Sequence, residues 1–237
     1  MPTAYVLDFD GTITTADLTT ELARQFGGRE FHQIEDLYRR RKLGMREWLK
    51  RMSAFLPADW ELLKSMALEW ASLRPGFKKF ARHCREQGSP LYIVSDGFGF
   101  YIEPVLEKLG CREEITAIFC NKAVVSGENK IEILSPYAHP ICTNCGNCKA
   151  ALVQRFRREG WKVAYAGDGN NDRFGAAWSH YIYARDELAE HCRNHGLPHL
   201  IWNDFEDILA AEPRRESFAH NPKDSPFCRP QDRGYLF

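Results

Sequence analysis

The chain has 237 residues, of which 44% are apolar and 13% aromatic, so it can bury a core in one domain or in one domain with an insertion. Basic and acidic residues both number 32, so the net charge is zero and no global basic field points to nucleic acid or an anionic membrane. No long apolar run predicts a membrane span, and the N-terminus lacks a basic signal segment, so we expect a cytoplasmic protein. Nothing in the sequence specifies an oligomeric state.

The first predicted strand ends in a polar cluster. Residues 4–7 are apolar and are followed at once by Asp8-Phe-Asp-Gly-Thr12, which is typical of a buried parallel strand whose carboxyl end carries polar residues. Over residues 17–72 the pattern becomes helical, because apolar residues recur every three or four positions and no strand signal interrupts them. We therefore predict a small helical-bundle cap, inserted after the first strand, over residues 17–72.

Strands and helices alternate again after the cap. In chain order we predict a helix that ends by Gly88, a strand at 91–94, a helix at 100–109, a strand near 117–120, a β-hairpin at 122–134, a helix at 148–159 and strands at 162–166 and 181–183. This order predicts an α/β fold with a Rossmann-like, three-layer core around a parallel sheet, built from residues 1–16 and 73–212. Residues 213–237 are polar and rich in proline, and we expect an extended C-terminal tail.

Three of the predicted strands end in polar clusters that contain glycine, at residues 8–12, 95–97 and 167–172. The carboxyl ends of parallel strands lie along one edge of an open sheet, where ligands bind. We therefore expect these three clusters, far apart in the sequence, to form one site.

The aspartates of these clusters are suited to phosphoryl transfer. A carboxylate can attack a phosphate and form an acyl phosphate, but two anions repel, and Mg²⁺ is a cation that prefers oxygen ligands. Asp8 and Asp10 both belong at the strand end, so one can attack while the other donates a proton to the leaving oxygen and later accepts one from water. Asp168 is the expected further metal ligand. Paired aspartates also occur as turn residues and helix caps, so the prediction depends on all three clusters.

In order and spacing, these clusters resemble the motifs of the haloacid dehalogenase superfamily of phosphatases over about residues 4–210. The resemblance implies that Asp8 is the nucleophile, that Asp10 is the general acid and base, and that Lys149 offsets the charge of the phosphate and of Asp8. It implies Mg²⁺ ligands at Asp8, Asp10 and Asp168, with Asp172 supporting them. It also implies phosphate-binding groups at Gly11, Thr12, Ser95, Asp96 and Gly97.

The helical insertion resembles the cap of phosphoserine phosphatases, and such caps close over small phosphomonoesters. Asp17 stands where those enzymes place a substrate-binding glutamate, although it fits a helix N-cap equally well. The arginine that holds the serine carboxylate in those enzymes falls near Met52 here, with Arg46 and Arg51 close by.

Two details resemble a different subgroup. Ser95-Asp-Gly replaces the Ser-Gly-Gly of phosphoserine phosphatases, and three cysteines precede Lys149. Both features resemble the methionine-salvage phosphatases that act on 2-hydroxy-3-keto-5-methylthiopentenyl-1-phosphate, and the related phosphoethanolamine/phosphocholine phosphatases. The implied substrate is a methionine-salvage-type sugar phosphate, with phosphoserine, phosphoethanolamine and phosphocholine as alternatives.

The cysteine run places soft ligands at every third position, at His139, Cys142, Cys145 and Cys148. Cysteine pairs with this spacing chelate Zn²⁺ tetrahedrally, so we predict a structural zinc ion, with Cys120 or Cys111 as alternatives to His139. An iron–sulfur cluster is a weaker alternative, because the ferredoxin pattern expects a fourth cysteine followed by proline. The other alternative is a loop of reduced thiols that pack as small apolar groups.

Two classes of function follow from these residues. The first is a small-molecule phosphatase, and the second is a non-catalytic metal-binding interaction module that has kept the fold. Degenerate relatives usually lose the nucleophile or the second aspartate, whereas this chain has both and also keeps Ser95, Lys149 and Asp168. Catalysis is therefore favoured. A phosphotransferase would share the first half-reaction.

Overall fold

The computed structural model describes residues 2–127 and 130–222, and a seven-stranded sheet lies at their centre. The strands are β1 (Thr3–Leu7), β2 (Leu91–Phe98), β3 (Ala117–Ser126), β4 (Lys130–Leu134), β5 (Lys162–Gly167), β6 (Tyr181–Ala184) and β7 (Leu200–Ile201). Their order in the sheet is β4-β3-β2-β1-β5-β6-β7, and only β3 and β4 pair antiparallel. These two form the predicted hairpin, whose tip at 128–129 lies outside the described residues.

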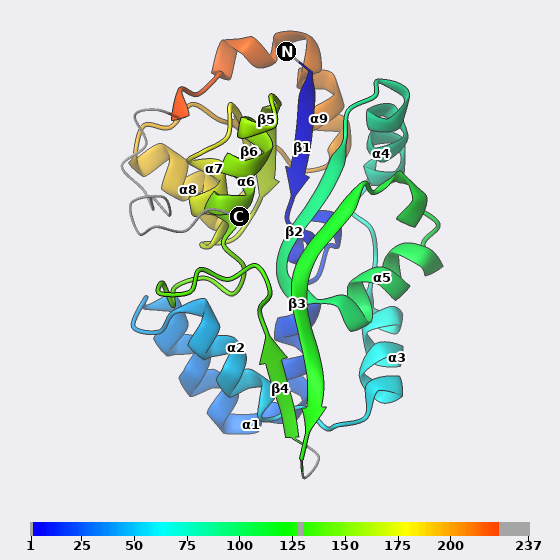
Figure 1. The fold of residues 1–237 in the computed structure, drawn as a ribbon, viewed down its shortest axis with the longest axis vertical. Helices are drawn as coiled ribbons and strands as arrows, with labels where there is room; N and C mark the ends of the chain where they lie inside the picture. The colour runs from blue at the N-terminus through cyan, green and yellow to red at the C-terminus, as the bar shows by residue number, and fades with distance from the viewer. Residues whose placement is uncertain (1, 128–129, 223–237) are drawn as a thin grey trace.

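The sheet separates two layers of helices because alternate side chains of each strand point to opposite faces. On one face Tyr5 and Leu7 pack into an apolar cluster with α4 (Phe77–Glu86), α5 (Gly99–Lys108) and α9 (Phe205–Ala211). On the other face Val6 packs with α6 (Lys149–Arg158), α7 (Asp172–Ala176) and α8 (Asp186–Asn194). Figure 1 shows these helices on either side of the strands. The predicted three-layer α/β fold is confirmed.

The sheet grows on both sides of its central strand, β1. From β1 the chain builds β2 and β3 on one side, and later β5, β6 and β7 on the other. The neighbours of β1 are therefore β2 and β5, and the order of strands reverses there. Ligands of such sheets bind beyond the carboxyl ends of the strands at this reversal, which is where the three predicted polar clusters lie.

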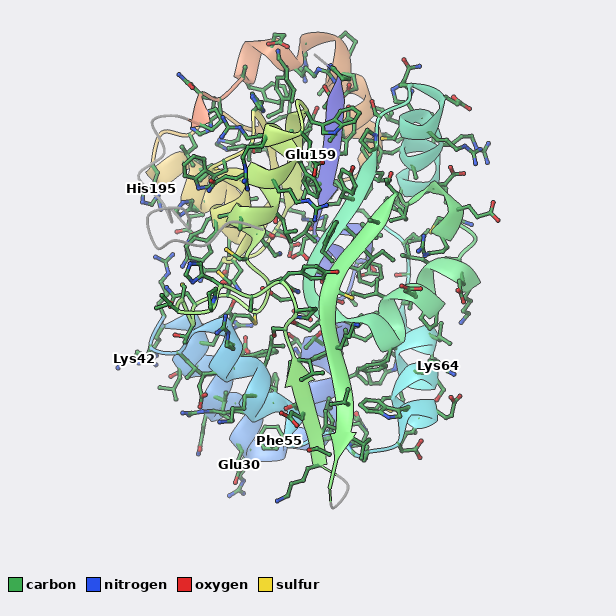
Figure 2. All side chains as sticks on the ribbon, in the orientation of Figure 1. Glu30, Lys42, Phe55, Lys64, Glu159 and His195 are labelled. Atoms are coloured by element: carbon green, nitrogen blue, oxygen red, sulfur yellow. The ribbon has the colours of Figure 1, made fainter. Side chains whose placement is uncertain are left out.

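Three helices, α1 (Leu18–Arg39), α2 (Met45–Ser53) and α3 (Trp60–Trp70), fill the segment between β1 and β2 where the cap was predicted. Asp17 caps α1, since its side chain accepts a hydrogen bond of 2.8 Å from the Thr20 N–H, which confirms the N-cap alternative for Asp17. Apolar residues of the three helices face one another and the core, while Figure 2 shows Glu30 and Lys64 pointing outward.

Two short segments connect the cap to the core and run side by side. The N–H of Thr15 donates to the carbonyl of Ser72 (3.0 Å), and the N–H of Arg74 donates to the carbonyl of Ile13 (2.8 Å). The segment that leads into α1 and the segment that follows α3 are therefore held together as one narrow connection between cap and core.

Strand β3 joins the expected strand near 117–120 to the hairpin, and the short elements α7, α8, β7 and α9 were not predicted. Two further differences concern β2 and the C-terminal segment. Strand β2 continues through Ser95, Asp96 and Gly97 to Phe98, with a shift of register against β3 after Val94. Residues 212–218 form a short 3₁₀ helix, η3 (Glu212–Phe218), instead of the expected extended tail. Phe218 anchors this helix by packing against Tyr183, at a ring-centroid distance of 5.6 Å. The rest of the predicted tail, residues 223–237, lies outside the described residues.

Candidate active site

A cavity of about 650 Å³ lies between the cap and the carboxyl ends of the strands. Its floor is formed by the polar clusters after β1, in the last residues of β2 and after β5, together with Lys149 at the start of α6. Its opposite wall comes from α1 and α2 of the cap. Among the lining residues from the core are Asp8, Asp10, Ser95, Asp96, Gly97, Lys149, Asp168 and Asp172, and α8 adds Glu187, Glu190, His191 and Asn194 at one side. The three clusters predicted to converge do so.

Lys149 joins two carboxylates at the bottom of this cavity. Its Nζ lies 2.9 Å from Asp8 Oδ2 and 2.6 Å from Asp172 Oδ1, and the residue is only 1% exposed. Burial alone lowers the pKa of Lys149, but the charges of Asp172 and Asp8 outweigh it and raise the pKa well above its usual value. The side chain is therefore a fixed positive charge beside Asp8.

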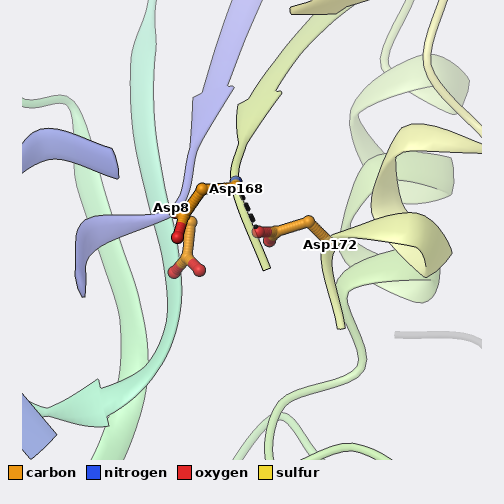
Figure 3. A group of neighbouring side chains, drawn as sticks. All are labelled: Asp8, Asp168 and Asp172. Atoms are coloured by element: carbon orange, nitrogen blue, oxygen red, sulfur yellow. Dashed lines mark hydrogen bonds between the residues drawn. The ribbon is translucent and has the colours of Figure 1, made fainter. Parts of the chain in front are cut away.

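Three carboxylates, those of Asp8, Asp168 and Asp172, form a cluster at this point (Figure 3). One ligand oxygen from each lies within 4.8 Å of the others. Burial and the neighbouring Asp172 raise the pKa of Asp8 well above its usual value and that of Asp168 to about 7. Neighbouring carboxylates repel one another when ionised, and a bound divalent cation would stabilise their ionised form. This set of oxygen donors therefore fits a metal ion that prefers oxygen ligands.

The carboxylate of Asp172 accepts hydrogen bonds on both of its oxygens. Its Oδ1 accepts from Lys149 and from the Tyr165 hydroxyl (2.6 Å), and its Oδ2 accepts from the N–H groups of Asp168 and Gly169 at 3.0 and 2.9 Å. Figure 3 shows the bond to the Asp168 N–H. Asp172 therefore fixes the position of both Lys149 and the backbone of Asp168.

Asp10 is held apart from the carboxylate cluster. Its Oδ1 accepts a hydrogen bond of 3.0 Å from the Leu18 N–H at the start of α1, and its Oδ2 accepts one from the Tyr101 hydroxyl. Burial and the nearby Asp17 raise its pKa well above the usual value. The structure therefore places the Asp10 carboxylate toward the cap, outside the group formed by the side chains of Asp8, Asp168 and Asp172. A role of Asp10 as a Mg²⁺ ligand stays a prediction from the sequence.

The turn between Asp8 and Thr14 is folded back by two groups. Gly11 has a φ of +75°, which other residues rarely adopt, and a Cβ on it would displace the Asp168 carboxylate. The Thr12 hydroxyl donates to Asp168 Oδ1 (2.5 Å), which orients that carboxylate.

Arg74 was missed by the sequence analysis. This arginine is 8% exposed, and its guanidinium donates to the carbonyls of Gly11 and Thr12, the latter at 2.9 Å. It also lies 5.5 Å from the centre of the Trp202 ring. Arg74 follows the helical insertion and belongs to no recognisable sequence motif. Only the fold shows that its guanidinium holds the turn after β1 in place.

The polar cluster at residues 95–97 of β2 is held in place by three asparagines. Asp96 accepts hydrogen bonds on one carboxylate oxygen from the Asn147 N–H (2.6 Å) and on the other from the Asn171 side chain (2.9 Å). The Asn121 side chain donates to the Asp96 carbonyl at 2.6 Å. Ser95 is 1% exposed and its hydroxyl accepts from the Gly97 N–H at 2.9 Å. The backbone of this cluster is therefore rigid, and it borders the cavity beside Asp10.

The predicted zinc ligands do not form a ligand cluster. Within the described ranges, the three acidic residues above are the only histidine, cysteine or carboxylate group of this kind. The cysteines at 142, 145 and 148 are buried, and the Nδ1 of His139 accepts hydrogen bonds from the N–H groups of Ile141 (3.1 Å) and Cys142 (2.9 Å). His139 thus serves as the cap of a turn in this loop.

A parallel α/β core with an acidic pocket beneath a helical cap defines a class of hydrolases, and a family model described as haloacid dehalogenase-like hydrolase matches residues 5–176. The chain belongs to this family, which confirms the resemblance of its motifs. It is 35% identical over 215 residues to the 2-hydroxy-3-keto-5-methylthiopentenyl-1-phosphate phosphatase of Geobacillus kaustophilus, covering 88% of this chain and 94% of that protein. It is also 35% identical over 208 residues to the bifunctional enzyme MtnB/MtnX of Bacillus licheniformis, covering 86% of this chain. The chain spans about half, 47%, of that longer relative.

Solved structures of similar fold include phosphoserine phosphatases. A substrate-bound complex aligns with a TM-score of 0.69 at 18% identity, over 89% of this chain and 98% of the other. A phospho-aspartyl intermediate analogue aligns with a TM-score of 0.67 at 19% identity, over 89% and 99%. At these identities the likeness shows a shared fold. In the part of the chain that the structure describes, no helix is long and apolar enough to cross a membrane.

Proposed function

We propose that the protein is a magnesium-dependent phosphatase that hydrolyses a small phosphomonoester through a phospho-aspartate on Asp8. The contact that supports this most directly is Lys149, whose ammonium lies 2.9 Å from the Asp8 carboxylate at the floor of a capped cavity. The family and the phosphatases among its relatives support the same activity. Mg²⁺, held by Asp8 and Asp168 with Asp172 behind them, would supply positive charge to the phosphoryl oxygens.

In the first step, a carboxylate oxygen of Asp8 attacks phosphorus while the bond to the ester oxygen breaks. The bonding electron pair leaves with that oxygen, which takes the proton carried by Asp10. In this proposal Lys149 and the N–H groups after Ser95 bind the phosphoryl oxygens, whose charge must be offset in the transition state. The Gly97 N–H would then exchange its hydrogen bond to the Ser95 hydroxyl for one to the phosphate.

In the second step, water attacks the phosphorus of the acyl phosphate. Asp10, now a carboxylate, accepts the proton of the water, and the electron pair of the breaking bond returns to Asp8. The products are an alcohol and inorganic phosphate, and both aspartates regain their starting states. The cap over the cavity excludes bulk water, so that one bound water reacts.

The cap wall favours an apolar leaving group over one with a carboxylate. Met45, Trp48 and Leu49 line the cavity, and this surface suits a methylthio tail. Of the three arginines that line the cavity, Arg24 donates to Glu21 at 2.7 Å and Arg39 donates to Glu35 at 2.8 Å, while Arg41 is exposed on the loop after α1. We therefore propose a methionine-salvage-type substrate, like that named for the relatives.

Phosphoserine is a less suitable substrate, because the residues considered for binding its carboxylate lie away from the cavity. Met52 is buried in the core of the cap, Arg46 donates to the carbonyl of His139 at 2.7 Å, and Arg51 pairs with Glu47. None of these three is among the residues that line the cavity. Phosphoethanolamine and phosphocholine remain the second candidates, because the acidic groups of the cavity wall would attract a cation.

A panel of phosphate monoesters tests the substrate. We expect kcat/KM for 2-hydroxy-3-keto-5-methylthiopentenyl-1-phosphate to exceed that for phosphoserine by about 100-fold, and Met45→Ala to reduce this ratio by about tenfold because an apolar contact is lost. The matched control is Met66→Ala, since Met66 lies on α3 and is absent from the cavity lining. A preference for phosphoserine would contradict the proposal.

Binding of Mg²⁺ should depend on pH. The pKa of Asp168 is raised to about 7 in the metal-free protein, so below this pH a proton must leave before the carboxylate binds a cation. We expect calorimetry to give a Kd for Mg²⁺ about tenfold weaker at about pH 6 than at about pH 8, with about one proton released per ion at the lower pH. An affinity that is the same at both values would contradict this assignment.

The structural zinc ion at His139, Cys142, Cys145 and Cys148 stays a prediction from the sequence. Binding would require these side chains to move together from their hydrogen-bonded arrangement. The zinc content of protein purified without chelator decides it, and less than about half an equivalent would count against the site.

A further inference from the structure

Tyr101 contacts the one carboxylate oxygen of Asp10 that the cap backbone does not hold. Its hydroxyl donates to Asp10 Oδ2, while the Leu18 N–H donates to Oδ1. Tyr101 comes from α5, far from Asp10 in sequence, and is 0% exposed. With one donor on each oxygen, the plane of the Asp10 carboxylate is fixed.

The ring of Tyr101 has no freedom to turn away. It packs against Phe9, Phe98 and Phe100, with ring centroids 6.2, 6.4 and 5.3 Å apart. A Cβ on Gly97 would lie 2.1 Å from the Tyr101 hydroxyl and 2.5 Å from Asp10 Oδ2. Glycine at position 97 therefore leaves the space in which the hydroxyl and the carboxylate meet.

The same hydroxyl reaches the cap. Its oxygen lies 2.7 Å from the Thr19 hydroxyl, which belongs to α1 and borders the cavity. Because the proton of Tyr101 is directed at the Asp10 carboxylate, its oxygen accepts the hydrogen bond from Thr19. Thr19, Tyr101 and Asp10 thus form one chain of hydrogen bonds from the cap to the acid/base group.

We propose that Tyr101 is a positioning residue, which holds Asp10 toward the reacting oxygen and connects its orientation to the seating of the cap through Thr19. The inference rests on the proposed role of Asp10. A carboxylate that shuttles a proton must meet the leaving oxygen first and the attacking water afterwards, so a small rotation would impair both steps.

Tyr101→Phe tests this by removing the hydroxyl and keeping the ring. With p-nitrophenyl phosphate we expect kcat to fall about 10- to 100-fold, because the lost hydrogen bond involves a charged acceptor. We expect KM to fall with kcat, because slower dephosphorylation lets the phosphoenzyme accumulate. Nitrophenolate leaves without an acid, so the variant should release about one equivalent in a rapid burst before slow dephosphorylation. Thr19→Val should cause a smaller loss, since the bond from Tyr101 to Asp10 remains.

Tyr183→Phe is the matched control. Tyr183 is also 0% exposed and its hydroxyl bonds a carboxylate, that of Glu212 at 3.0 Å, but it lies outside the cavity lining. We expect its kcat to stay within about twofold of the wild type. If Tyr101→Phe behaves like this control, or loses activity without a burst, the positioning role is wrong while the phosphatase proposal stands. Turnover by Asp8→Asn would instead contradict the phosphatase mechanism itself.

Discussion

Replacement of Asp8 by asparagine is expected to abolish hydrolysis of phosphate monoesters, with a fall in kcat of about 10⁴-fold or more. The amide has nearly the shape of the carboxylate, but its oxygen is a poor nucleophile and its charge cannot help to hold Mg²⁺. Lys149 keeps Asp172 as a partner at 2.6 Å, so the fold should tolerate the change. A Mg²⁺-dependent assay with p-nitrophenyl phosphate measures the loss.

Two observations separate this loss from general damage. Asp36→Asn is a matched control, because Asp36 pairs with Arg40 on the exposed surface of the cap and does not line the cavity, and its kcat should stay within about twofold of the wild type. Acid-quenched wild-type enzyme should carry phosphate on the peptide that contains Asp8, and the asparagine variant should carry none. Turnover by the variant at about a hundredth of the wild-type rate or more would contradict Asp8 as the nucleophile.

The position of the site could be predicted because each strand end is recognisable from a short stretch of sequence. An apolar run that stops at a polar cluster marks the carboxyl end of a buried strand, and parallel pairing then brings the ends of β1, β2 and β5 together. The helical periodicity of residues 17–72 likewise predicted α1, α2 and α3 between the first two of these strands. Patterns of this kind need no knowledge of which side chains meet.

The supporting side chains could not be predicted because their partners are distant in sequence. Arg74 contacts the turn 62 and 63 residues before it, and Tyr101 contacts Asp10 across 91 residues. Neither residue lies in a motif whose spacing indicates its partner. The extension of β2 through Asp96 and Gly97 was missed for a related reason, since aspartate and glycine are poor strand formers and the asparagines that bind Asp96 hold that backbone in place.

The cysteine run shows how one spacing can serve two structures. Cysteines at every third position suit a chelating loop, and they are equally compatible with buried thiols next to a turn whose backbone N–H groups point at one acceptor. In the structure that acceptor is His139 Nδ1. Arg46 of α2 donates to the carbonyl of the same residue, and the Met45 N–H donates to the carbonyl of Asn144 at 3.0 Å. The loop therefore joins the cap to the segment that leads into Lys149.

Lys149→Met is expected to reduce kcat about 10³-fold and to destabilise the fold by about 3–5 kcal/mol. The variant keeps an unbranched side chain but leaves the carboxylates of Asp8 and Asp172 buried without their common cation. Lys162→Met is the matched control: its ion pair with Glu216 is at the surface, where such a pair contributes about 1 kcal/mol or less, and kcat should not change. Activity assays and urea unfolding of both variants measure the two effects.

The pH dependence of that destabilisation identifies its cause. Burial and Asp172 already raise the pKa of Asp8 well above its usual value, and without Lys149 this pKa must rise further, because the attraction of the lysine lowers it. A carboxyl group whose pKa is raised by folding takes up a proton in the folded state as pH falls, and the folded state gains stability relative to the unfolded chain. We therefore expect the difference in free energy of unfolding between wild type and Lys149→Met to narrow from about pH 8 to about pH 6. A difference that stayed constant over this range would mean that the methionine disturbs packing, and that Lys149 does not act through the charge of Asp8.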